Sequence, residues 1–340
     1  MIDADRYTSG RIALANLSAS IASLELRRAA GTTFEELLAL SKLLFVRGDL
    51  LGRIADHDRA ELTATEAIAL APGSASALYI RAQLAGRFHR FEEANARLDQ
   101  ALAAGYPGHE VDAERAALLQ ATGQYCQALA LRERLAKDHP GIHTLGALAS
   151  LLAEMGQWAA AEKHYATALA ADEGISPIPC AQALFEWGVN AMRRGDLDCA
   201  EGIFAKLDAI LPAHVPGRGH RAEVALARGQ LDIAAALIEP LLEISDDPEY
   251  RAIRAEILAA RGDGEAAREA QRAATGYEAL LARRPEAYAD HAAAFFMGVG
   301  NRPQLAVDLA AANWKLRDTP RSRSLLAKAL SNAHQVSLCT

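Results

Sequence analysis

The sequence predicts an all-α protein built as a solenoid of helix hairpins. It is 51% hydrophobic but only 6% aromatic, and most of the apolar residues are alanine and leucine, which favour helices and let them pack closely. An apolar helical stretch, a glycine turn, a bulky residue, a small alanine and a second apolar helix recur along the chain. From Gly123 to Gly300 the turn glycines lie about 33 to 39 residues apart, which is the length of one helix hairpin.

The region before the repeats is expected to hold one extra helix. Residues 12–28 have a helical composition, and Thr33 lies three residues before Glu36 in a capping box that begins the next helix. We therefore assign residues 1–33 to an N-terminal segment and begin the repeat array at residue 34.

The first two hairpins depart from the regular pattern. Gly48 comes early in the first hairpin, which predicts a long loop from Gly48 to Asp56 between its two helices. The second hairpin runs from Leu78 through Phe91 to Ala101 without a turn glycine at the usual place. Both segments keep the length of a helix pair.

The later hairpins are more regular. Their turns are expected at Gly123, Gly156, Gly195, Gly229, Gly262 and Gly300. Glycine lets the chain reverse, and the small alanine that follows lets the two helices approach. Two prolines in residues 172–179 disfavour helix there, and Pro240 should kink the helix in which it falls. The helix after Gly262 is expected to continue to Arg284, the array to end at residue 318, and a capping helix and tail to fill residues 319–340.

This pattern resembles the tetratricopeptide repeat (TPR) family over roughly residues 34–318. The clearest copy consists of Trp187, Gly188, Ala191, Gly195, Leu197, Ala200, Phe204, Leu207 and Pro212. The resemblance implies a right-handed α-solenoid of about seven to eight TPR-like hairpins, whose first helices line a concave face. Residues 285–292 and 316–320 resemble a bacterial subgroup of such proteins, of unknown activity.

The concave face that the resemblance implies is the predicted binding surface. The side chains expected on it are Tyr79, Gln83, Arg87, Glu110, His143, Ser150, Glu154, Phe185, Val189, Met192, Arg193, Glu223 and Glu256. Such a mixed lining suits an extended peptide or a partner's helix. Family members that grip the C-terminal carboxylate of chaperones use lysine and asparagine at these inner positions, and this chain lacks that set. Chaperone docking of that kind is therefore disfavoured.

Two further groups invite a functional interpretation and have a simpler one. His214 and His220 lie at the start of a short first helix, where a loop would expose them to a ligand, but solvated or capping histidines are the simpler reading. Asp290 and His291 suggest acid and base chemistry, yet adjacent residues on a helix do not face each other. We expect packing between hairpins at the second pair.

The leading functional hypothesis is a scaffold or adaptor that binds a protein or peptide in its concave groove. The alternative is an accessory or regulatory subunit that binds a small molecule or presents a substrate peptide to a partner enzyme. The sequence lacks a phosphate-binding glycine loop, a hydrolase elbow and a metalloprotease motif. We therefore expect no catalytic residue, cofactor or metal, and an enzyme is the least favoured reading.

Charge and hydropathy bear on the class of partner and on location. The chain has 43 acidic and 36 basic residues in mixed order, with a net charge of -7, whereas nucleic-acid binding requires a concentrated basic face. No apolar run approaches the roughly 18 residues that span a bilayer. We expect a cytoplasmic protein that binds neither nucleic acid nor membrane, with a homo-oligomer possible through its solenoid ends.

Overall fold

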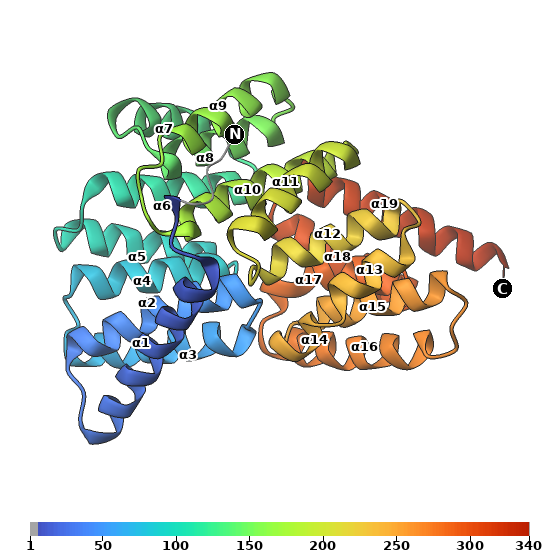
Figure 1. Ribbon diagram of the computed structural model, residues 1–340, viewed down its shortest axis with the longest axis horizontal. Coiled ribbons are helices and arrows are strands. Elements are labelled where there is room, and N and C mark those ends of the chain that lie inside the picture. The colour runs from blue at the N-terminus through green and yellow to red at the C-terminus, as the bar shows by residue number, and fades with distance from the viewer. Residues whose placement is uncertain (1–5, 340) are drawn as a thin grey trace.

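The computed structural model describes residues 6–339, which contain helices, turns and loops but no strand (Figure 1). The helices are α1 (Gly10–Ala30), α2 (Phe34–Leu51), α3 (Ile54–Leu70), α4 (Ala75–Arg87), α5 (Phe91–Ala103), α6 (Gly108–Ala121), α7 (Tyr125–Asp138), α8 (Ile142–Glu154), α9 (Trp158–Ala170), α10 (Pro177–Arg193), α11 (Leu197–Ile210), α12 (Val215–Ala227), α13 (Leu231–Ile238), α14 (Leu241–Ile244), α15 (Pro248–Ala260), α16 (Ala266–Arg283), α17 (Pro285–Met297), α18 (Pro303–Leu316) and α19 (Pro320–Cys339).

The helices pair into hairpins along the chain. The pairs are α2 with α3, α4 with α5, α6 with α7, α8 with α9, α10 with α11, α12 with α13, α15 with α16, and α17 with α18. The first helices of most neighbouring hairpins also contact one another, for example α8 with α10 and α12 with α15, and we call the first helices the inner layer and the second helices the outer layer. The prediction of an all-α solenoid is confirmed, with α1 before the hairpins and α19 after them.

The turn inside each hairpin depends on one residue in the left-handed backbone conformation. Glycine fills this position in six hairpins, at Gly52, Gly123, Gly156, Gly195, Gly229 and Gly262. Glycine adopts a positive φ without steric cost, which explains the regular spacing. His89 and Asn301 fill the same position in the other two hairpins, with φ of 55° and 46°. The expected pivot at Gly300 is therefore wrong by one residue, since asparagine also tolerates this conformation.

The predicted loop from Gly48 to Asp56 is wrong, because α2 continues to Leu51 and α3 begins at Ile54. Gly48 lies inside α2, where it makes room for His57 of α3. A Cβ atom at Gly48 would lie 2.5 Å from Nε2 of His57. Gly48 therefore serves helix packing, and Gly52 makes the turn.

The prolines act partly as predicted. Pro240 separates α13 from α14, which confirms the expected interruption. Pro177, however, begins α10, and Pro179 lies in its first turn, so the expectation that these prolines disfavour helix is wrong. Proline is tolerated there because the first N–H groups of a helix have no partner within the helix. Helix α16 is long, as expected, and α19 begins at Pro320.

The solenoid turns back on itself, so that its first hairpins contact its last ones. Figure 1 shows α3 beside α14 and α16. The carboxylate of Asp246, in the loop after α14, accepts hydrogen bonds from the backbone N–H groups of Ile54 at 2.7 Å and Ala55 at 3.0 Å. We call the contacts between residues 52–123 and residues 245–319 the seam.

Charged and apolar side chains both hold the seam. The guanidinium of Arg284 lies 2.7 Å from Asp58 and 2.9 Å from Glu61, and its central carbon lies 3.4 Å from the centroid of the Phe88 ring. A buried apolar cluster spans the same boundary and consists of Ile54, Phe88, Leu280, Ala287 and Tyr288. Because these residues come from distant parts of the chain, the seam fixes how far the solenoid closes.

Candidate functional site

Part of the predicted binding surface is used for packing between hairpins. Tyr79 is 9% exposed, and its ring stacks on Tyr106 with centroids 4.2 Å apart. The hydroxyl of Tyr106 donates to the carboxylate of Glu110 at 3.1 Å. Val189 is buried, and Phe185 is half-buried beside His214 and His220. These aromatic and apolar positions contribute to the stability of the inner layer more than to an open surface.

The other predicted residues keep part of their side chains exposed. They are Gln83, Arg87, His143, Ser150, Glu154, Met192, Arg193, Glu223 and Glu256. The first seven of these residues lie on α4, α8 and α10. Glu223 lies on α12, and Glu256 lies on α15. The structure thus places them on one layer, although in two separate stretches of it.

The stretch on α8 and α10 meets the C-terminal helices. Arg193 of α10 is 39% exposed and lies 3.8 Å from Glu154 of α8. Burial, together with the nearby Arg321 of α19, lowers the pKa of Arg193 to about 10. This surface therefore combines residues that are more than 100 positions apart in the sequence.

The stretch on α12 and α15 carries a carboxyl group that is easily protonated. Glu256 forms no hydrogen bond or ion pair with the residues that the structure describes. Burial and the neighbouring carboxylates of Glu223 and Glu249 raise the pKa of Glu256 to about 7. The charge of this surface therefore changes near neutral pH.

Asp290 and His291 contact neighbouring parts of the solenoid, as expected, and their contacts are ionic. Nδ1 of His291 lies 3.1 Å from Glu249, and Asp290, only 7% exposed, lies 3.4 Å from Arg317. Asp290 and Glu249 raise the pKa of His291 to about 9. These side chains form an ionic cluster between α15, α17 and the C-terminal end of α18, which sequence reasoning missed because its members share no local pattern.

His214 is a capping residue, which was the simpler of its two interpretations. It is 2% exposed, and its Nδ1 accepts a hydrogen bond from the backbone N–H of Gly217 at 3.0 Å. Burial lowers the pKa of His214 to about 4, so the ring is neutral at pH 7. His220 pairs with Glu223 one turn further along α12.

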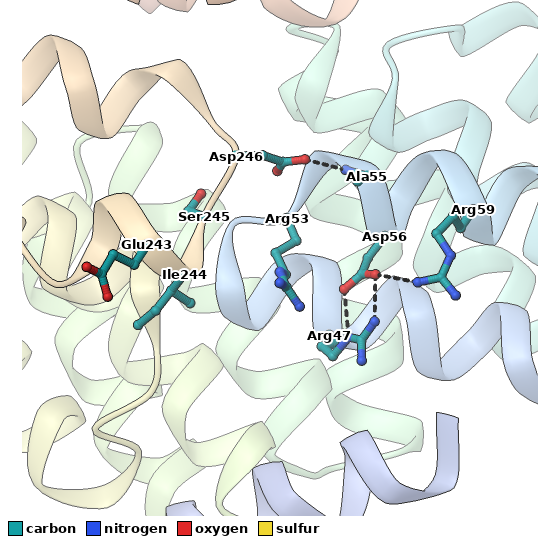
Figure 2. Close-up of a pocket in the computed structure, with 9 residues that line it drawn as sticks. All are labelled: Arg47, Arg53, Ala55, Asp56, Arg59, Glu243, Ile244, Ser245 and Asp246. Carbon is teal, nitrogen blue, oxygen red and sulfur yellow. Dashed lines mark hydrogen bonds and ion pairs between the residues drawn. The ribbon is translucent and has the colours of Figure 1, made fainter. Parts of the chain in front are cut away.

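A pocket of about 280 Å³ opens at the seam, between α2, α3 and the end of α14 (Figure 2). It is lined by Arg47, Arg53, Ala55, Asp56, Arg59, Glu243, Ile244, Ser245 and Asp246. Arg47 and Arg59 both pair with Asp56, at 2.6 Å and 3.3 Å. Arg53 lies at the same pocket without an ion pair to any described residue, so it is the cation there that remains available.

Two other properties concern the described residues alone. No group of three or more histidine, cysteine, aspartate or glutamate side chains among residues 6–339 is arranged to hold a metal ion. Within the same residues, no helix combines the length and apolar character needed to cross a bilayer.

Comparison with solved structures identifies the fold. A Rap protein in complex with competence and sporulation factor matches 94% of this chain and 99% of its own, at 15% identity and a TM-score of 0.56. Cut9 in the Cut9–Hcn1 hetero-tetramer of the APC/C, a TPR protein, matches 90% of this chain and 59% of its own, at 15% identity and a TM-score of 0.52. The chain has a tetratricopeptide repeat fold.

A tetratricopeptide repeat protein from Parabacteroides merdae also matches, at 21% identity over 71% of this chain and 92% of its own, with a TM-score of 0.46. No protein-family model matches the sequence, and no curated protein resembles it significantly. The helix hairpins and their turns, together with these structural matches, establish the TPR fold.

Proposed function

We propose that the protein is a peptide-binding scaffold, which holds an extended segment of a partner protein on the inner layer formed by α4, α6, α8 and α10. The proposal assigns no catalytic step to the chain. The proposed surface includes most of the residues that the sequence suggested. Gln83, Ser150, Glu154 and Arg193, for example, belong to these helices.

One observation carries the proposal. Polar side chains of these four helices lie beside one another and remain partly exposed: Gln83 lies beside Glu114, Ser150 beside Glu186, and Glu154 3.8 Å from Arg193. A row of hydrogen-bonding side chains on successive parallel helices matches the repeated donors and acceptors of an extended peptide. The outer layer carries instead local ion pairs, such as Arg272 with Glu269 on α16.

The experiment is a selection from a random library of 12-residue peptides, followed by affinity measurement on purified protein. Ser150→Trp places a large side chain on the inner layer, and Lys163→Trp places the same side chain on the exposed face of α9. We expect selected peptides to bind the wild type and the Lys163 variant equally, and the Ser150 variant at least tenfold more weakly. Enrichment of no peptide, or equal binding to both variants, would overturn the proposal. Circular dichroism checks that both variants are folded.

The seam pocket favours a second candidate, an accessory or regulatory subunit that binds a small molecule. A volume of about 280 Å³ and a free guanidinium at Arg53 suit a small anionic compound. A thermal-shift screen of carboxylates and phosphates should find a stabilising compound whose effect disappears in Arg53→Ala. Absence of any shift that depends on Arg53 rules this candidate out.

A further inference from the structure

One buried residue on α7 breaks the pattern of the repeats. The eighth residue of the second helix is a large, mostly apolar side chain in four hairpins, and its exposed fraction there is at most 1%. These residues are Leu98, Tyr165, Phe204 and Ile238. In α7 the same position holds Arg132, which is 9% exposed. In the remaining hairpins the position holds Glu61, Ala273 and Ala310, so Arg132 is the one cation at it.

The buried Nε of Arg132 has no hydrogen-bond partner among the residues that the structure describes. The charges that act on the guanidinium are Glu114 of α6, Glu154 of α8 and Glu186 of α10. Since all three belong to the inner layer and Arg132 starts from the outer layer, its head must point inward, toward the surface proposed to bind peptide.

The three glutamates have polar neighbours of their own. Glu186 accepts a hydrogen bond from Gln182 at 3.1 Å, Glu114 lies beside Gln83, and Glu154 lies beside Tyr125. Burying a charged group whose hydrogen bonds are incomplete is unfavourable, whereas an apolar side chain at the same place is favourable. The arginine at this position therefore points to a ligand that completes its hydrogen bonds.

We propose that Arg132 binds an uncharged amide group of the peptide ligand, an inference that rests on the proposed function. A ligand carboxylate would be repelled by the three surrounding glutamates, and a ligand ammonium by the guanidinium itself. An amide is neutral, and it offers a carbonyl oxygen to Arg132 and an N–H group to a neighbouring carboxylate. The amide belongs either to the peptide backbone or to an asparagine or glutamine side chain.

The decisive variant is Arg132→Leu, which installs the residue that the second hairpin has at this position. If Arg132 serves a ligand, the variant unfolds at a higher urea concentration than the wild type and binds a selected peptide at least tenfold more weakly. If Arg132 serves the fold, the variant is less stable, and the inference is overturned. Unchanged affinity also overturns it. Arg134→Leu, at an exposed site two residues along the same helix, is the matched control and should leave affinity unchanged.

The peptide and the salt concentration test the chemical class. At one position of the peptide, replacing the backbone amide by an ester, or an asparagine or glutamine by alanine, should abolish the effect of Arg132. The wild type and Arg132→Leu should then bind the altered peptide with equal affinity. Which replacement does so identifies the source of the amide. Because the ligand group is neutral, the contribution of Arg132 to affinity should change less than about threefold between 0.05 and 0.5 M salt. A loss of tenfold or more with salt would indicate an ionic ligand and overturn the assignment.

These outcomes separate the two proposals. If peptides bind and the Ser150 variant loses them while Arg132→Leu does not, the scaffold stands and the role of Arg132 fails. If no peptide binds, both fail. A gain in stability without a loss of binding would show an unfavourable buried charge with no ligand, which also contradicts the inference.

Discussion

The cap of α3 is supplied from the other end of the solenoid, and its removal is a quantitative test of the seam. Helix α3 has no side-chain cap of its own, because the residue before it is Arg53. The carboxylate of Asp246 accepts from the N–H groups of Ile54 and Ala55, across 192 residues of sequence. Replacing a helix-capping side chain by alanine costs about 0.5 to 2 kcal/mol, and bonds to a charged acceptor lie toward the upper end.

We expect Asp246→Ala to lower the free energy of unfolding by about 1.5 kcal/mol. With an m-value of about 3 kcal/mol per molar urea, the midpoint should fall by about 0.5 M. Asp246→Asn keeps a neutral oxygen acceptor and should lose about half as much. The assay is equilibrium urea unfolding followed by circular dichroism. A change below about 0.3 kcal/mol for the alanine variant, or equal losses for both variants, would refute the idea that this carboxylate holds the seam.

Two further predictions concern packing and charge. A Cβ atom at Gly188 would lie 2.6 Å from the ring of Phe204, so Gly188→Ala should destabilise the protein by about 1 to 3 kcal/mol. Gly202 has open space around it, so Gly202→Ala is the control and should be neutral or stabilising. Thermal unfolding measures both effects. The pKa of His291 is raised to about 9. Its pairing with Glu249 therefore contributes stability that is fully present below pH 6.5 and is lost as the pH rises through 9. The difference in melting temperature between wild type and His291→Gln should therefore shrink from pH 6.5 to pH 9.5; a constant difference would contradict the assignment.

Closure of the solenoid has a consequence for function. Helix α2 contacts α12 as well as its sequence neighbours, so the inner layer is covered where the first and sixth hairpins meet. The inner layer between these points runs from α4 to α10, and its polar side chains are partly exposed. A partner peptide on this protein would therefore contact fewer hairpins than the full number that the sequence predicts.

The sequence by itself determined the hairpins and most of their turns. Glycine at a positive φ and a small alanine near the start of the second helix act over a few residues, so a repeat of about 33 to 39 residues is visible without any tertiary information. The exception at Gly48 shows the limit. Its role became clear only with the position of His57, because a glycine inside a helix and a glycine in a turn look alike in sequence.

The tertiary structure decided which distant residues meet. The pairs of Asp246 with the start of α3, and of Arg284 with Asp58, depend on the curvature summed over many hairpins, and small differences in each hairpin accumulate along the solenoid. No period in the sequence records that sum. Arg132 lies between the two cases: its departure from the repeat is visible once the second helices are aligned, but only the structure reveals that it is buried and that its Nε lacks a hydrogen-bond partner among the described residues.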